Sequence, residues 1–193
     1  MLYTEQTPNP ESLKFVTNRM LYRGTADFRE EAFAKEWSPL GAALFELPYV
    51  KGVYISGNFV TISKEFNYAW EDIMLNAKDF IKKYMEDEKP VLKDGFTEAM
   101  AKIEADKIGA IPDGQDGEIS VRIRDLIDTY VKPAVEMDGG NIEFKSFVEG
   151  TVTVILQGSC SGCPSSTVTL KSGIEGMLQR MVPEVKEVVA EAQ

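Results

Sequence analysis

The segment from Thr151 to Met181 constrains the fold most, because its pattern changes twice. Thr151–Gln157 alternates apolar and polar residues, which predicts a β-strand. The loop Gly158-Ser159-Cys160-Ser161-Gly162-Cys163-Pro164 follows, and a helical pattern then runs to about Met181. This loop holds both cysteines of the chain, which has no histidine. Any soft-metal site, redox pair or disulfide would therefore use these two sulfurs.

The elements around this segment predict a small α+β domain. An apolar helical stripe ends at Asp138-Gly139-Gly140, where glycine can adopt a left-handed cap. Pro133 lies inside the stripe and should kink the helix. A hairpin turns at Glu149-Gly150. The predicted order is α-β-β-α-β, with these ranges: helix 123–135, strands 141–147 and 151–157, helix 164–181 and strand 185–189.

The first half of the chain predicts a second α/β domain. Its clearest element is a hairpin of two β-rich runs around Gly57-Asn58, a pair that tolerates the positive φ of a tight turn. Residues 69–85 carry an apolar stripe at three- and four-residue steps, which predicts a helix. The full set of expected elements is strand 13–16, helices 26–37 and 39–45, strands 50–56 and 59–63, and helix 69–85.

Between these regions the chain is charged and rich in turn residues. Glu86-Asp87-Glu88-Lys89-Pro90 stops a helix, and residues 111–117 are dense in Gly, Pro and Asp. We therefore predict an α+β protein of two small α/β domains joined by a flexible linker. The expected bounds are 1–88 for the first domain, 89–117 for the linker and 118–193 for the second domain.

Composition excludes several classes of partner. The formal net charge is −10, which disfavours binding to nucleic-acid phosphates or to anionic membranes. No apolar run reaches the length of about 20 residues that a membrane helix needs. The first residues, Met1–Glu5, lack the features of a secretory signal or transit peptide. We therefore expect a cytoplasmic protein that binds neither nucleic acid nor membrane.

Four interpretations of Cys160 and Cys163 follow from their spacing. A thioredoxin-like dithiol would suit a CxxC near a helix N-terminus, but the segment after Glu118 is short for that fold. A structural zinc site takes four protein ligands, and this chain offers two thiolates and no histidine, so a zinc-linked dimer of two chains would be needed to close it unless carboxylates help. Inert packing cysteines do not suit a loop of Gly and Ser.

The fourth interpretation is an iron–sulfur site. Such clusters are normally held by four thiolates, so two per chain form half a site that a second subunit would complete. A cluster held between chains at a small-residue loop is open to competing thiols. That arrangement suits a carrier or scaffold.

The motifs also resemble a known family. Asp138-Gly139-Gly140-Asn141, a hairpin, and the run from Gly158 to Ser166 resemble the NifU-like C-terminal domain of the Nfu family of iron–sulfur cluster proteins. Asn141 stands where that family often has aspartate. The runs Thr7-Pro8-Asn9-Pro10, Ser12–Phe15 and Ser38-Pro39-Leu40 resemble the family's Nfu N-terminal domain.

The resemblance implies a scaffold or carrier that is not an enzyme. It implies that Cys160 and Cys163 are the metal ligands, and that a homodimer binds a 4Fe–4S cluster between its two CxxC pairs and hands it to apo-proteins. The expected partners are apo iron–sulfur proteins and cluster-assembly proteins. Two cysteines per chain also suit a 2Fe–2S cluster. The alternative function is a CxxC dithiol oxidoreductase.

Overall fold

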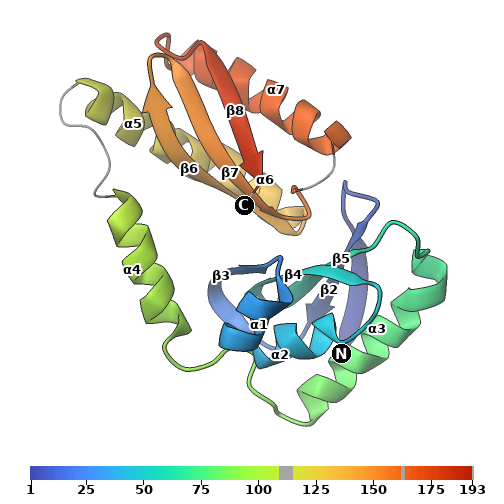
Figure 1. The fold of residues 1–193 in the computed structure, drawn as a ribbon. Coiled ribbons are helices and arrows are strands. Elements are labelled where there is room, and N and C mark those ends of the chain that lie inside the picture. Colours follow the sequence, from blue (N-terminus) through green and yellow to red (C-terminus); the bar gives the residue numbers. More distant parts are fainter. Residues whose placement is uncertain (109–114, 162–163, 193) are drawn as a thin grey trace. The chain divides into compact units, whose positions relative to one another are not determined.

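The computed structural model describes residues 1–108, 115–161 and 164–192. The chain divides into two compact units, Met1–Glu98 and Ala99–Gln193 (Figure 1). Each unit contains one β-sheet with helices packed against it. The prediction of an α+β chain with two small α/β domains is therefore confirmed.

The N-terminal unit is built on a five-stranded antiparallel sheet with strand order β1-β2-β5-β4-β3. Phe15 and Thr4 are cross-strand partners, and Trp70 and Met74 of the long helix contact them. Because cross-strand partners share a face of the sheet, these contacts place that helix on one face. The elements are β1 Leu2–Gln6, β2 Ser12–Thr17, β3 Tyr22–Phe28, α1 Glu31–Trp37, α2 Pro39–Phe45, β4 Val50–Gly57, β5 Phe59–Lys64, α3 Trp70–Glu86 and α4 Phe96–Ile108.

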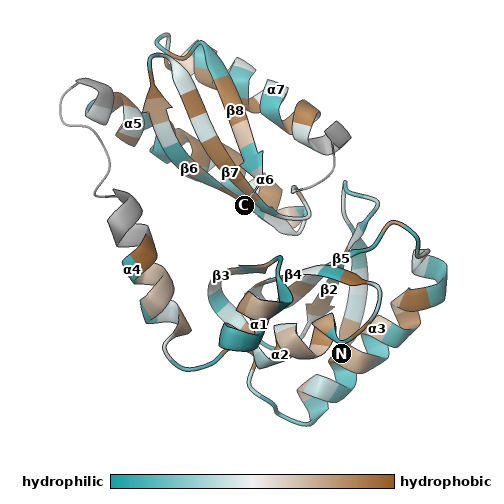
Figure 2. Ribbon diagram, in the orientation of Figure 1, coloured by the Kyte–Doolittle hydropathy of each residue, from teal (hydrophilic) through white to brown (hydrophobic). Residues whose placement is uncertain are grey.

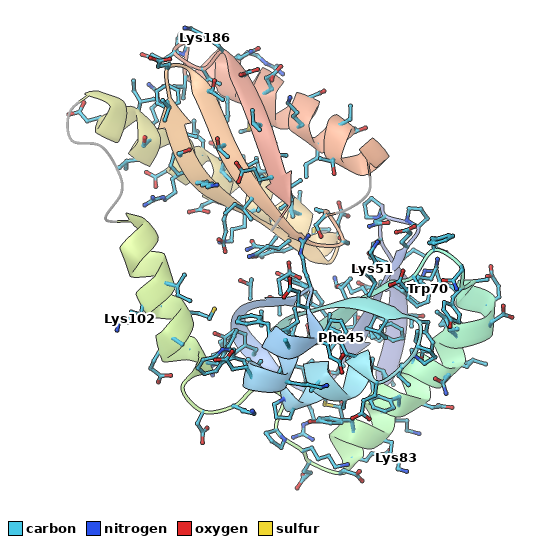
Figure 3. The ribbon with its side chains drawn as sticks, in the orientation of Figure 1. Phe45, Lys51, Trp70, Lys83, Lys102 and Lys186 are labelled. Atoms are coloured by element: carbon cyan, nitrogen blue, oxygen red, sulfur yellow. The ribbon has the colours of Figure 1, made fainter. Side chains whose placement is uncertain are left out.

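Local sequence signals account for the elements that were predicted closely. The β4–β5 hairpin turns at Gly57, whose φ of 53° is the left-handed conformation expected there. Helix α2 begins at Pro39, and the Ser38 hydroxyl caps it by accepting from the Gly41 amide at 2.9 Å. Trp70, labelled in Figure 3, starts α3 and donates from Nε1 to the Pro10 carbonyl at 3.0 Å.

Two predictions for this unit were wrong or incomplete. Residues 26–28 are strand and not helix, because Ala26 and Phe28 pair with Ile55 and Val53 of β4. This pairing outweighs the local helix propensity. The edge strand β1 was not predicted, since its residues are mostly polar and its register comes from pairing with β2.

Residues 91–96 pack against the N-terminal unit. The Ser38 hydroxyl donates to the Val91 carbonyl at 2.7 Å, and the Lys93 amide donates to the Trp37 carbonyl at 2.8 Å. Phe96, 2 % exposed, has its ring centroid 5.6–6.0 Å from those of Tyr22, Phe28 and Trp37. The first part of the expected linker segment thus contributes to the core of this unit.

The C-terminal unit has the predicted α-β-β-α-β order in its described residues. Strands β6 and β7 pair antiparallel, and β7 and β8 pair parallel. The helices cover one face of the sheet, where apolar side chains from both layers form one core (Figure 1). Brown, hydrophobic segments recur along these strands in Figure 2. The elements are α5 Gln115–Leu126, a π-helical turn Ile127–Val131, α6 Lys132–Met137, β6 Gly140–Val148, β7 Thr151–Gly158, α7 Pro164–Met181 and β8 Glu187–Ala192.

Where the sequence predicts a kink at Pro133, the structure has a π-helical turn that precedes α6. Proline has no N–H to donate within the helix, and the Lys132 amide bonds to the Ile127 carbonyl five residues back. Strand β8 begins two residues later than predicted. Val185 instead closes a turn, with its amide donating to the Val182 carbonyl at 3.0 Å.

Among the described helices, none is both long enough and apolar enough to cross a bilayer.

Candidate functional site

The first candidate ligand, Cys160, lies just beyond the end of β7. Gly158 ends the strand with a φ of 64°, and the Ser161 amide donates to the Gly158 carbonyl at 3.2 Å, which forms a turn. Cys160 is 8 % exposed and belongs to the core of the C-terminal unit. The second candidate, Cys163, lies outside the described residues. The structure therefore places one of the two predicted ligands.

The turn between α6 and β6 holds the residue before Cys160. The Ser159 hydroxyl donates to the Asp138 carbonyl at 2.6 Å, and the Ser159 amide donates to the Gly139 carbonyl at 3.3 Å. Gly139 itself has a φ of 80° and caps α6 through its amide, which donates to the Glu136 carbonyl. The loop that carries Cys160 is thus bonded to a second loop that is distant in sequence.

From the sequence, Asp138-Gly139-Gly140 was predicted to end a helix and was part of the motif that resembles the NifU-like domain, but no contact with the cysteine loop was predicted. The structure shows that this turn is also part of the site's surroundings. The one signal in the sequence was the pair of adjacent glycines, which indicates close approach by another part of the chain. It does not say which part approaches.

Asn141 is fully buried beside this turn. Its Nδ2 donates to Gln157 Oε1 at 2.9 Å and to Glu143 Oε1 at 3.3 Å. Among the described residues, its Oδ1 has no hydrogen-bond partner. An amide suits this position because a carboxylate there would face the carboxylate of Glu143 and repel it.

Burial raises the pKa of the Cys160 thiol above its ordinary value, because the apolar surroundings disfavour the charged thiolate. The hydrogen bond with Ser159 lowers the pKa in part, whereas the nearby Asp138 carboxylate raises it. In the metal-free protein Cys160 is therefore mainly a protonated thiol near neutral pH.

This shift predicts slow alkylation of Cys160. In a Cys163→Ser variant the reaction with iodoacetamide should be slower than in the same protein unfolded in urea, because less thiolate is present at a given pH. Its rate should keep rising with pH beyond the midpoint of about 8.5 that is usual for cysteine. Intact mass measured over time, from about pH 7 to about pH 10, gives both profiles. A folded-state midpoint at or below that of the unfolded chain would contradict the prediction.

The described residues contain no cluster of three or more Cys, Asp or Glu side chains that could hold a metal ion. The soft ligand that they contain is the sulfur of Cys160, which lies in the turn after β7. Thiolate sulfur is a soft ligand that suits zinc, copper(I) and iron–sulfur clusters. This donor type fits an iron–sulfur cluster, with the remaining ligands to come from elsewhere.

Comparison with known proteins identifies both units. The family model described as "Scaffold protein Nfu/NifU N terminal" matches residues 2–88. The model described as "NifU-like domain" matches residues 123–189, which include both cysteines.

Curated relatives match nearly the whole chain. Proteins from Drosophila sechellia and Drosophila simulans, each named "NFU1 iron-sulfur cluster scaffold homolog, mitochondrial", are 40 % identical over 97 % of this chain. The chain spans 63 % of the length of these relatives. The solution NMR structure of a NifU-like protein from Saccharomyces cerevisiae is 24 % identical, with a TM-score of 0.43 over 49 % of this chain and 85 % of that chain.

These names contradict one prediction. The expected cytoplasmic location is wrong, since the relatives are named as mitochondrial. The prediction rested on the composition of Met1–Glu5. Because the chain spans only part of its relatives' length, those residues carry no information on location. The two family matches and the relatives agree on the rest: this chain belongs to the Nfu family, with an Nfu N-terminal domain followed by a NifU-like domain.

Proposed function

We propose that this chain is a non-enzymatic iron–sulfur cluster scaffold that binds a labile cluster through Cys160 and Cys163 and transfers it to apo-proteins. The observation that carries the proposal is the CxxC pair in the strand-to-helix loop of a NifU-like domain. The relatives' name, which describes an iron–sulfur cluster scaffold homolog, supports the same role.

The cluster is cargo in this proposal, and we infer that two copies of the chain share it. Four thiolates normally hold a 4Fe–4S cluster, and each chain has two cysteines and no histidine. A homodimer with Cys160 and Cys163 from each copy would supply the full set. The main binding form is then a 4Fe–4S cluster between subunits.

Transfer would proceed by ligand exchange. An acceptor thiol would lose its proton, and its sulfur would form a bond to a cluster iron as the bond to a scaffold cysteine breaks. The released scaffold thiolate would then take up a proton. One iron–thiolate bond replaces another, so the exchange needs no oxidant or reductant. Acceptors are therefore apo-proteins with free cysteines, and assembly proteins would supply the cluster.

Anaerobic reconstitution of the full chain tests the proposal. With ferrous iron, sulfide and a thiol reductant, we expect a broad visible absorbance band and a shift of the native mass from monomer to dimer. Iron and sulfide analysis should give one four-iron cluster per two chains; two irons per two chains would indicate a 2Fe–2S form. A colourless product that stays monomeric and reduces a test disulfide would instead support a dithiol oxidoreductase.

A further inference from the structure

Gly140 is packed closely against Cys160, the first candidate ligand. Gly140 begins β6 and pairs with Gly158 at the end of β7, two residues before Cys160. A Cβ built on Gly140 would lie 2.9 Å from Cys160 Sγ, 2.7 Å from the Gln157 carbonyl oxygen and 3.2 Å from the Cys160 amide nitrogen. The first two distances are shorter than side chains tolerate. The sulfur therefore occupies space that any other residue at position 140 would fill.

The glycines within α7 are not crowded in this way, although a Cβ built on Gly150 at the hairpin turn would lie 2.8 Å from the Lys186 side chain. A Cβ built on Gly173, within α7, would meet nothing within 4 Å. One built on Gly176 would come no closer than 3.9 Å to the Arg180 side chain. Gly139 and Gly158 have a positive φ and Gly140 does not, so backbone conformation alone does not require glycine at position 140.

The neighbouring contacts fix the backbone on which this fit depends. Ser159 bonds to the Asp138 and Gly139 carbonyls, which holds the start of the cysteine loop against the turn that leads into Gly140. With the backbone held at Ser159, the Cys160 sulfur has a limited range of positions. The bare Cα of Gly140 leaves one of these positions free.

We propose that Gly140 is a positioning residue for the Cys160 sulfur. The effect of Gly140 on cluster binding rests on the proposed scaffold function. The contact itself is a property of the metal-free protein and can be tested without any cluster.

The first test is a double-mutant cycle in the metal-free full chain, with Gly140→Ala, Cys160→Ala and the double variant. Hydrogen exchange of β6 and β7 amides reports the opening of this unit. Gly140→Ala should accelerate this exchange, and the acceleration should be about tenfold smaller when Cys160 is already alanine, because the added methyl group then fits the space of the sulfur. The clash with the Gln157 carbonyl remains in both backgrounds, so part of the acceleration persists. Equal acceleration in both backgrounds would overturn the proposal.

The second test measures the cluster. After anaerobic reconstitution, the Gly140→Ala variant should contain at most half of the wild-type iron per chain. The visible circular dichroism of its remaining cluster should differ from that of wild type. The control variant Gly173→Ala should match wild type in both measurements. If Gly140→Ala fails to fold, Ser159→Ala probes the same placement. Ser159→Ala removes the hydrogen bond to the Asp138 carbonyl and the contact of the hydroxyl with Cys160 Sγ, and it should also lower the iron content. Wild-type iron content and spectrum in both Gly140→Ala and Ser159→Ala would refute the positioning role.

The two tests separate the failure of this inference from that of the proposed function. If wild type takes up no cluster, the scaffold proposal fails, while the double-mutant cycle still decides whether Gly140 positions the sulfur. If wild type binds a cluster and the cycle shows no coupling, the scaffold proposal stands and the positioning role fails.

Discussion

Replacing Cys160 with alanine should abolish stable cluster uptake by this protein. Loss of one cysteine per chain removes two of the four thiolates in a shared site, and the chain has no histidine to replace them. Iron and sulfide bound after anaerobic reconstitution and desalting should fall from the wild-type value to background. The native mass should stay that of the metal-free protein. Cys163→Ala should give the same result.

The Cys160→Ala variant should still fold, so that its loss of cluster uptake can be assigned to the missing ligand. Cys160 is a small buried side chain, and its truncation should cost about 1 kcal/mol of the free energy of unfolding. Gly173→Ala is the control, since it lies in α7 outside the cysteine loop and a Cβ built there would meet nothing within 4 Å. Full cluster stoichiometry in either cysteine variant would refute the ligand assignment.

The second large effect should come from Phe96→Ala in the N-terminal unit. The Phe96 ring is 2 % exposed and packs among three aromatic rings, Tyr22, Phe28 and Trp37. Removing it leaves a cavity, and such changes typically cost about 3–5 kcal/mol. That is a large fraction of the 5–15 kcal/mol typical of a whole domain. Urea unfolding followed by tryptophan fluorescence measures the cost, because both tryptophans, Trp37 and Trp70, lie in this unit.

Ile103→Ala is the control for this prediction. Ile103 lies on the same helix, α4, but is 47 % exposed, so its truncation should change the free energy of unfolding by less than about 0.5 kcal/mol. Cluster uptake should be unchanged in both variants, because Phe96 belongs to the unit that does not contain the candidate ligands, and Ile103 is an exposed side chain of α4. A cost for Phe96→Ala as small as that for Ile103→Ala would show that residues 91–96 do not stabilise the N-terminal unit.

Hairpins and helix ends were predictable because single residues determine them. Gly57-Asn58 sets a two-residue turn, and Ser38-Pro39 sets a helix start, whatever the rest of the chain does. The strand at residues 26–28 was not predictable in this way. Its backbone takes its conformation from pairing with β4, which is distant in sequence, and local propensity there favours a helix.

The candidate site likewise has a part that was predictable from the sequence and a part that was not. The candidate ligands were predicted from their spacing and from the absence of histidine, which are properties of the chain alone. The surroundings of Cys160 were not, since the bonds from Ser159 to Asp138 and Gly139 join segments that only folding brings together. The sequence also gives no direct sign that Phe96 belongs to the core, because one aromatic residue in a charged segment has no periodic pattern.

The parallel pairing of β7 with β8 has a consequence for the timing of assembly. A parallel pair needs a crossover connection, and here that connection consists of the cysteine loop and α7. The first end of the crossover is held by the β6–β7 pairing and by the bonds of Ser159, whereas its second end is held only when β8 pairs with β7. During synthesis the cysteine loop therefore emerges before the strand that completes the crossover. If the chain binds a cluster as proposed, we expect this competence to require that β8 has joined the sheet.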